Sequence, residues 1–138
     1  MTLTGIDHCT VVVSDMERAV KFYRDGLGLP EMEIPSTFPG AGLAVRWFKL
    51  GEQYIHLFPM PAADPPSPKH VAMKVSDANA ARAYFKARGV ETKETVPIPG
   101  ADRFFIADPD GNRIEIIQWS DTSAIVPVKR NGGTNGAD

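Results

Sequence analysis

Short β-branched stretches and helical patterns of apolar positions alternate along the chain, and the same order occurs twice. Residues 6–13 are short and β-branched, which predicts a strand. Ser14 then offers a helix N-cap, and Glu17, three positions on, completes a capping box. An apolar stripe at helical spacing follows, made of Met16, Ala19, Val20, Tyr23 and Leu27. Gly26 and Gly28 are expected to end this helix.

The remainder of the first half predicts three more strands, near residues 31–34, 43–49 and 53–58. A long loop over residues 35–42, rich in proline and glycine, separates the first two. The first half therefore follows the order β-α-β-β-β. Residues 59–68 then contain five prolines, a density that helix interiors and central strands exclude. We expect a semi-rigid, extended connector there.

The pattern restarts after the connector. A strand is expected at residues 70–75, and a helix from Asp77 to about Arg88 that ends at Gly89. Further strands are expected near residues 90–96, 103–107 and 113–119. The sequence "DPDGN" between the last two is a strong turn signal, because Pro fits one turn position and Gly or Asn tolerates positive φ. The second half is also β-α-β-β-β.

Length favours one domain built from two modules. Two independent domains of about 60 residues would be marginally stable, whereas 138 residues can bury one shared core. We expect a single α+β domain over residues 1–119, with module one at about 3–58 and module two at 69–119. Residues 120–138 form a C-terminal tail that ends in "NGGTNGAD" and is expected to be partly disordered.

Composition excludes several classes of function. The net charge is −2 and no basic run is present, so a nucleic-acid partner is not expected. The apolar stretches are far shorter than the roughly 20 residues that span a bilayer, and the N-terminus has no signal-peptide pattern, so we expect no membrane association. Cys9 is the only cysteine, which excludes an intrachain disulfide and suits a reducing compartment. A cytoplasmic protein is the expectation.

The repeat brings four good metal ligands to equivalent positions. His8 and His70 open the two copies, at an offset of 62 positions. His56 in "YIHLF" and Glu115 in "RIEII" close them, at an offset of 59. Because duplicated modules pack around a pseudo-twofold axis, these four side chains could converge on one point.

Strand periodicity supports that prediction. His56 shares a strand face with Tyr54 and Phe58. A glutamate between two isoleucines, as Glu115 is, is costly to bury unless it is paired or bound to a metal.

Arg46 and Arg103 lie in the third strand of each copy and are nearly symmetric. They could hold a substrate carboxylate or phosphate, although ordinary ion pairing is an equally good interpretation.

The paired β-α-β-β-β modules, the opening histidines and "DPDGNRIEI" together resemble the vicinal oxygen chelate superfamily. This group includes glyoxalases, methylmalonyl-CoA epimerases, fosfomycin resistance proteins, extradiol dioxygenases and bleomycin-binding proteins. The resemblance covers about residues 3–119. It implies two modules side by side whose curled mixed sheets form a partly open cup around a divalent metal, usually in a homodimer. It also implies that His8, His70 and Glu115 are ligands.

His56 departs from the pattern that the resemblance implies. Isomerases and epimerases of the family carry Glu or Gln at that position, and a metal-bound carboxylate moves the substrate proton. Here Glu115 alone is left for that work, and His56 would be a fourth ligand or a nearby acid/base group. Three imidazoles and one carboxylate can hold Zn²⁺, Ni²⁺, Mn²⁺, Co²⁺ or Fe²⁺.

Three functions follow from the resemblance. The first is a divalent-metal-dependent lyase, isomerase or epimerase that acts on a small substrate with vicinal oxygens, with Glu115 and His56 as catalytic residues. The second is an Fe²⁺ extradiol-type dioxygenase, for which two histidines and one glutamate suffice. The third is a metal-free protein that binds a small molecule, as the bleomycin binders do. The four ligands could come from one chain or from two, since both module arrangements occur in the family.

Overall fold

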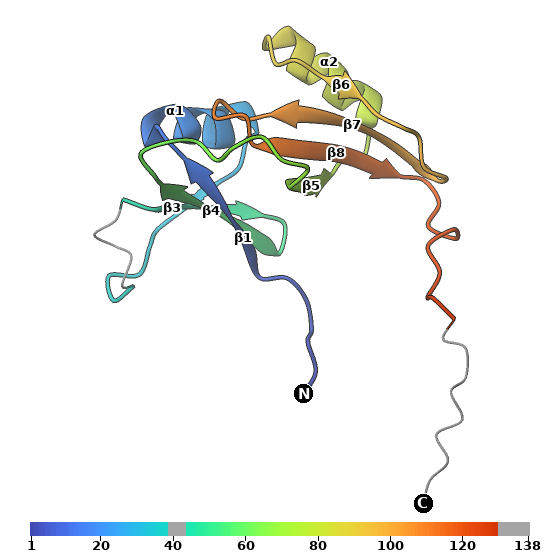
Figure 1. Cartoon of the computed structure of the whole chain (residues 1–138), viewed down its shortest axis with the longest axis horizontal. Coiled ribbons are helices and arrows are strands. Elements are labelled where there is room, and N and C mark those ends of the chain that lie inside the picture. Colours follow the sequence, from blue (N-terminus) through green and yellow to red (C-terminus); the bar gives the residue numbers. More distant parts are fainter. Residues whose placement is uncertain (39–43, 130–138) are drawn as a thin grey trace, which may run out of the picture.

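A computed structural model of the protein describes residues 1–38 and 44–129 (Figure 1). Module one consists of β1 (His8–Val13), α1 (Met16–Val20), the π-helix η1 (Lys21–Gly26), β2 (Glu31–Met32), β3 (Arg46–Leu50) and β4 (Gln53–Pro59). Module two consists of β5 (His70–Lys74), α2 (Ala78–Ala87), β6 (Lys93–Glu94), β7 (Ala101–Ala107) and β8 (Arg113–Trp119). Within the described part of the chain, no helix is long and apolar enough to span a bilayer.

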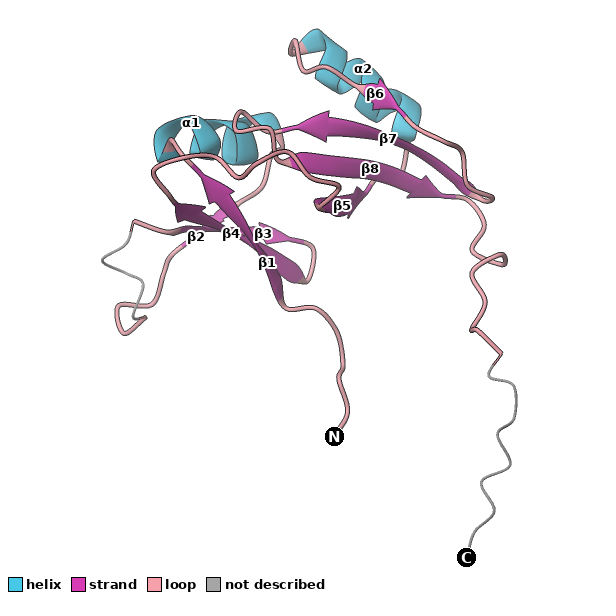
Figure 2. Ribbon diagram, in the orientation of Figure 1, coloured by secondary structure: helices cyan, strands magenta, loops and turns pink. Residues whose placement is uncertain are grey.

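The two modules have the same sheet topology. Module one forms the sheet β1-β4-β3-β2, here called sheet A, and module two forms β5-β8-β7-β6, here called sheet B. In each sheet the first strand pairs in parallel with the last, and the other pairs are antiparallel. Figure 2 shows the two open sheets with one helical segment each. The predicted α+β fold with two β-α-β-β-β modules is confirmed.

The central strands agree with the prediction and the edge strands are shorter. β4, β7 and β8 cover the predicted ranges, whereas β2 and β6 contain only two residues each. An edge strand has a single neighbour, so its length depends on that partner more than on its own sequence. Residues 39–43 lie outside the described residues, as does the final "NGGTNGAD". They hold part of the proline-rich loop and the first position of the strand predicted near residues 43–49, which is present as β3 at Arg46–Leu50.

The predicted capping box at the first helix is wrong. Asp15, not Ser14, is the N-cap of α1, and its side chain accepts from the Arg18 backbone N–H at 3.1 Å. Ser14 instead donates its backbone N–H and its hydroxyl to Asp110, 96 positions away. At the second helix, Asp77 is the N-cap as predicted and accepts from Ala80.

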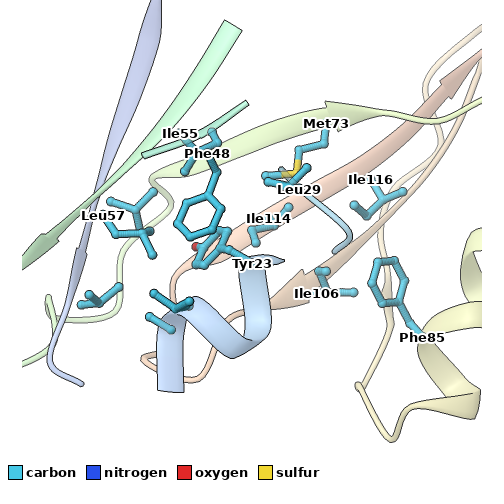
Figure 3. Packing of buried hydrophobic residues seen from close by; sticks show 14 of the residues in the cluster. Tyr23, Leu29, Phe48, Ile55, Leu57, Met73, Phe85, Ile106, Ile114 and Ile116 are labelled. Carbon is cyan, nitrogen blue, oxygen red and sulfur yellow. The ribbon is translucent and has the colours of Figure 1, made fainter. Parts of the chain in front are cut away.

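Both modules contribute to one continuous core (Figure 3). Tyr23 of η1 is fully buried, with its ring 6.3 Å from that of Phe48 in sheet A. Its hydroxyl donates to Asp108 of module two at 2.8 Å. Burial and the adjacent Asp108 carboxylate raise the pKa of Tyr23 far above its ordinary value, so this hydroxyl remains a donor.

Further hydrogen bonds fix the two modules against each other. The Asn112 side chain donates to the Val12 carbonyl at 2.9 Å, and the Tyr84 hydroxyl donates to the Gly26 carbonyl at 2.6 Å. Each joins a group of module one to a group of module two. The "DPDGN" turn, which was expected only to connect two strands, therefore also anchors module two to the end of β1.

Replacing Gly100 with alanine should destabilise the protein by about 1–3 kcal/mol. Gly100 has φ of +78°, and a Cβ there would lie 1.8 Å from the Asp121 carbonyl oxygen. The chain must therefore move where Ser120 donates its backbone N–H to the Gly100 carbonyl at 2.8 Å. Denaturant unfolding would measure the loss. Gly111→Ala is the matched control, because Gly111 also has positive φ but has open space at its Cβ, so an equal loss in both variants would contradict this reasoning.

Candidate functional site

Each sheet has one face in the core and one face turned away from it, here called the cup face. In sheet A the core face carries Val11, Val13, Ile55 and Leu57, all buried. Because side chains alternate along a strand, His8 and His56 lie on the cup face of sheet A. In sheet B, Ile114 and Ile116 are buried in the core, so Glu115 and Arg113, which alternate with them, lie on the cup face. His70 pairs with Arg113 and therefore lies on the same face.

Three rings form a stack on the cup face of sheet A. The His8 and His56 rings lie 4.0 Å apart with an angle of 17° between their planes. The Trp47 ring lies against the other side of His56, at 4.4 Å and 5°. We call these three rings the ring stack. Partial burial, and secondly the adjacent His8, lower the pKa of His56, which favours its neutral form.

The two opening histidines are oriented alike. Nδ1 of His8 lies 2.7 Å from the Asp7 carboxylate, and Nδ1 of His70 lies 2.9 Å from the Pro68 carbonyl. In each case a residue just before the histidine holds the same ring nitrogen. This arrangement favours Nε2 as the nitrogen that would bind a metal, as the outer partners of metal-bound histidines do.

Glu115 is 7% exposed and has a partner at each oxygen. Its Oε1 accepts from Arg103 Nη1 at 3.1 Å, and its Oε2 lies 3.1 Å from His70 Nε2. A neutral His70 that donates from Nδ1 to Pro68 has no second proton for Glu115. Nε2 and Oε2 are both ligand atoms of the kind that bind divalent metals, and together they would hold one.

Arg103 is largely buried and is held by two groups. Besides its contact with Glu115, its Nη2 donates to the Val96 carbonyl at 2.8 Å. Its Nε is buried and has no hydrogen-bond partner among the described residues. Arg103 therefore lies at the candidate site, in contact with a candidate ligand.

Arg46 does not lie at the site. Trp47 pairs with His56 in sheet A, and Phe105 pairs with Glu115 in sheet B. Trp47 and Phe105 are therefore equivalent positions of the two modules, and they are 58 residues apart. The two arginines are 57 positions apart, one fewer, and a shift of one residue along a strand moves a side chain to the other face. Arg46 pairs with the core residue Leu57 and forms an ion pair with Glu31. The expected equivalence of Arg46 and Arg103 is wrong.

The four predicted ligands form two separate pairs. His8 and His56 lie together on sheet A, and His70 and Glu115 lie together on sheet B. Over residues 1–38 and 44–129, no three His, Cys, Asp or Glu side chains gather as a metal site. A four-ligand centre therefore does not form between the two sheets of one chain in this structure.

The cup face of sheet A also lines a hollow of about 590 Å³ beside His8 and His56. Its apolar and aromatic lining residues are Met32, Pro35, Phe38, Val45, Trp47, Tyr54, Leu57 and Phe58. The sequence did not single out the hollow or the ring stack. Trp47 lies on the cup face because it pairs with His56 across the ladder, which the sequence alone does not show.

Comparison with known proteins gives one family. The profile of the "Glyoxalase/Bleomycin resistance protein/Dioxygenase superfamily" matches residues 5–116. A lactoylglutathione lyase from Escherichia coli O157:H7 is 29% identical over 140 aligned positions, which cover 83% of this chain and 92% of that protein.

Solved structures agree with the profile. A protein assigned to the glyoxalase family, from Bacillus anthracis, superimposes with a TM-score of 0.78 at 29% identity, covering 86% of this chain and 98% of its own. An antibiotic binding protein from Streptomyces sp. CB03234 superimposes with a TM-score of 0.68 at 26% identity, covering 87% and 99%.

Proposed function

The chain belongs to the glyoxalase, bleomycin resistance protein and dioxygenase superfamily, and on that premise we propose that it is a divalent-metal-dependent lyase, isomerase or epimerase. Its substrate is a small molecule with two adjacent oxygens. The observation that carries the proposal is the pairing of His70 Nε2 with Glu115 Oε2, 3.1 Å apart on the cup face, with Nδ1 of His70 already occupied.

The donor set fits a transition metal of intermediate softness. His8, His56 and His70 supply imidazole nitrogens, and Glu115 supplies one carboxylate, a combination suited to Zn²⁺, Ni²⁺, Mn²⁺, Co²⁺ or Fe²⁺. Such a metal would supply Lewis acidity toward the two substrate oxygens.

We propose that the complete site forms in a homodimer. The cup face of sheet A carries one ligand pair and the cup face of sheet B carries the other, and the two pairs are separate within the chain. A twofold dimer in which sheet A of one chain faces sheet B of its partner would bring both pairs together, twice. It would also cover the hollow on sheet A.

Proton transfer is assigned to Glu115 and His56. Arg103 holds Oε1 of Glu115, so Oε2 is the oxygen left to bind metal or accept a proton. The lowered pKa of His56 favours a neutral imidazole, which would either bind the metal as a fourth ligand or, when it is not bound to the metal, accept a proton from the substrate. The two groups would lie on opposite walls of the dimeric site.

Metal content and hydrogen exchange test this function together. The purified protein should retain about one divalent metal per chain, read by elemental analysis, and lose it to a chelator. In D₂O, the metal-loaded protein should introduce deuterium next to the carbonyl of α-hydroxyketones or hemithioacetals, and the chelated protein should not. A protein that retains no metal after loading would overturn the proposal.

An Fe²⁺ dioxygenase is the second candidate, because His8, His70 and Glu115 form the two-histidine, one-carboxylate set that such enzymes use. Bound iron with O₂ uptake on a catechol would favour it over the first. Binding of a small molecule without metal would favour the third function, that of the bleomycin binders.

Arg103→Gln should weaken metal binding by about 10–100-fold, the usual cost of losing the outer partner of a ligand. Arg103 orients Glu115 through Oε1 and neutralises its charge in a buried position. Titration with a competing metal indicator would measure the affinity. Arg46→Gln is the matched control, because Arg46 occupies the other face of sheet A. Unchanged affinity in the Arg103 variant would show that Glu115 is oriented without it.

A further inference from the structure

The hollow on sheet A has a lining that suits a flat apolar group. Its floor is the ring stack of His8, His56 and Trp47. Phe38 also lines it, with its ring centroid 5.1 Å from that of Trp47 in an edge-to-face arrangement. Met32 and Phe58 add further apolar surface. A flat apolar group would bury its faces here, and such rings are the surfaces on which planar groups stack.

The charged residues that line the hollow disfavour an anionic group. Asp7 and Glu33 are the only charged residues among the described side chains that line the hollow, apart from the histidines, and both are acidic. Lys49 shares the cup face by register with Tyr54, but it is exposed and does not line the hollow. A group with negative charge would therefore meet two carboxylates and no lysine or arginine of this lining.

Two arginines on the cup face of sheet B are already engaged. Arg103 is paired with Glu115, and Arg113 lies 4.2 Å above the Phe105 ring while donating to the Pro68 carbonyl. In the proposed dimer these groups would face the hollow from sheet B of the partner. Arg103 balances the buried carboxylate of Glu115. Lys74 and Lys93 share this face by register and are exposed, so the preference for an uncharged group rests on the lining of sheet A alone.

We propose that the substrate joins two vicinal oxygens to a flat, apolar and uncharged body, and that this body lies against the ring stack in the hollow. The proposal rests on the proposed function, because it places the oxygens at His8 and His56. It differs from a glutathione adduct, whose tripeptide part carries two carboxylates. This chain and the lactoylglutathione lyases to which it is similar would then differ in the body of the substrate.

Two probes with the same chelating head test the proposal. 2,3-Dihydroxynaphthalene has vicinal oxygens on a flat uncharged body, and its 6-sulfonate differs by one negative charge. Calorimetric titration of the metal-loaded dimer should show the uncharged probe binding at least about tenfold more tightly, since each tenfold is 1.4 kcal/mol. Equal affinities, or tighter binding of the sulfonate, would overturn the proposal.

Variants locate the binding surface. Trp47→Ala and, separately, Phe38→Ala should each weaken the uncharged probe about three- to tenfold, in the range of lost aromatic contacts. Glu33→Lys should strengthen the sulfonate severalfold and leave the uncharged probe nearly unchanged. Lys49→Ala is the control on the same face and should change neither affinity. Circular dichroism confirms that each variant is folded, and two folded aromatic variants without effect would contradict the proposal.

The same titrations after chelation separate this proposal from the proposed function. If the chelated protein still prefers the uncharged probe but never retains metal, the metal-dependent function fails and the assignment of the hollow stands. If the protein binds metal but does not discriminate between the probes, the assignment of the hollow fails and the metal-dependent function stands.

Discussion

Glu115→Gln should remove the bound metal while leaving the fold in place. The glutamine keeps the shape of the side chain and can still accept from Arg103, but it has no negative charge to offset the cation. The affinity should fall by more than the roughly 100-fold that losing an outer partner can cost, because a direct ligand is lost. Elemental analysis after dialysis measures the retained metal, and circular dichroism measures whether the fold is kept.

Glutamine is a better replacement here than alanine. Glu115→Ala would leave the largely buried Arg103 without its carboxylate, and breaking such a pair destabilises proteins by about 3–5 kcal/mol. A lost metal would then be hard to distinguish from a lost fold. Glu17→Gln, on the exposed side of α1, is the control for removing one negative charge. Full metal occupancy in the Glu115→Gln protein would refute its assignment as a ligand.

Mixing two defective chains should restore metal binding if the site lies between chains. His8→Ala spoils the sheet A half of the site and Glu115→Gln spoils the sheet B half. A heterodimer of the two has one site with both defects and one site with none. Random exchange of subunits gives about half heterodimers, so the mixture should bind about a quarter of the metal of the native dimer.

The control is a mixture of two variants with defects in the same half. His8→Ala mixed with His56→Ala leaves every site damaged, so no metal binding should return. Sedimentation at micromolar concentration should show a dimer for each protein. A monomer would refute the dimer outright, and a dimer without recovery on mixing would place the ligands within one chain.

The sequence was sufficient for the repeat, the order of elements and the alternation of faces along each strand because each rests on local patterns. Alternation places His8 and Val11 on opposite faces of one strand whatever the rest of the chain does. The sequence was insufficient where a residue far along the chain determines the local structure. Ser14 and Asp15 are both good N-caps. Asp15 takes that role because the Ser14 hydroxyl donates to Asp110 of the other module.

The position of Arg46 shows the same limit on a finer scale. Arg46 and Arg103 look symmetric because both lie in the third strand of their module. The sheet face that each side chain occupies, however, depends on which residue it pairs with on the neighbouring strand. The loop before β3 is long, so counting along the sequence could not fix the register to a single residue, and one residue is enough to reverse the face. The partner of Trp47, which is His56, settled it.

The hydrogen bonds between the modules have a consequence for synthesis on the ribosome. Asn112 reaches the Val12 carbonyl across 100 positions of sequence, and Tyr23 finds its acceptor at Asp108. When only module one has emerged, the Tyr23 ring can pack on Phe48, but its buried hydroxyl lacks the Asp108 acceptor and η1 lacks its contacts with module two. A fragment of about 60 residues is also too small to hold itself together well. The nascent first module should therefore remain loosely packed until the second has been translated, and the chain should complete its fold only after release.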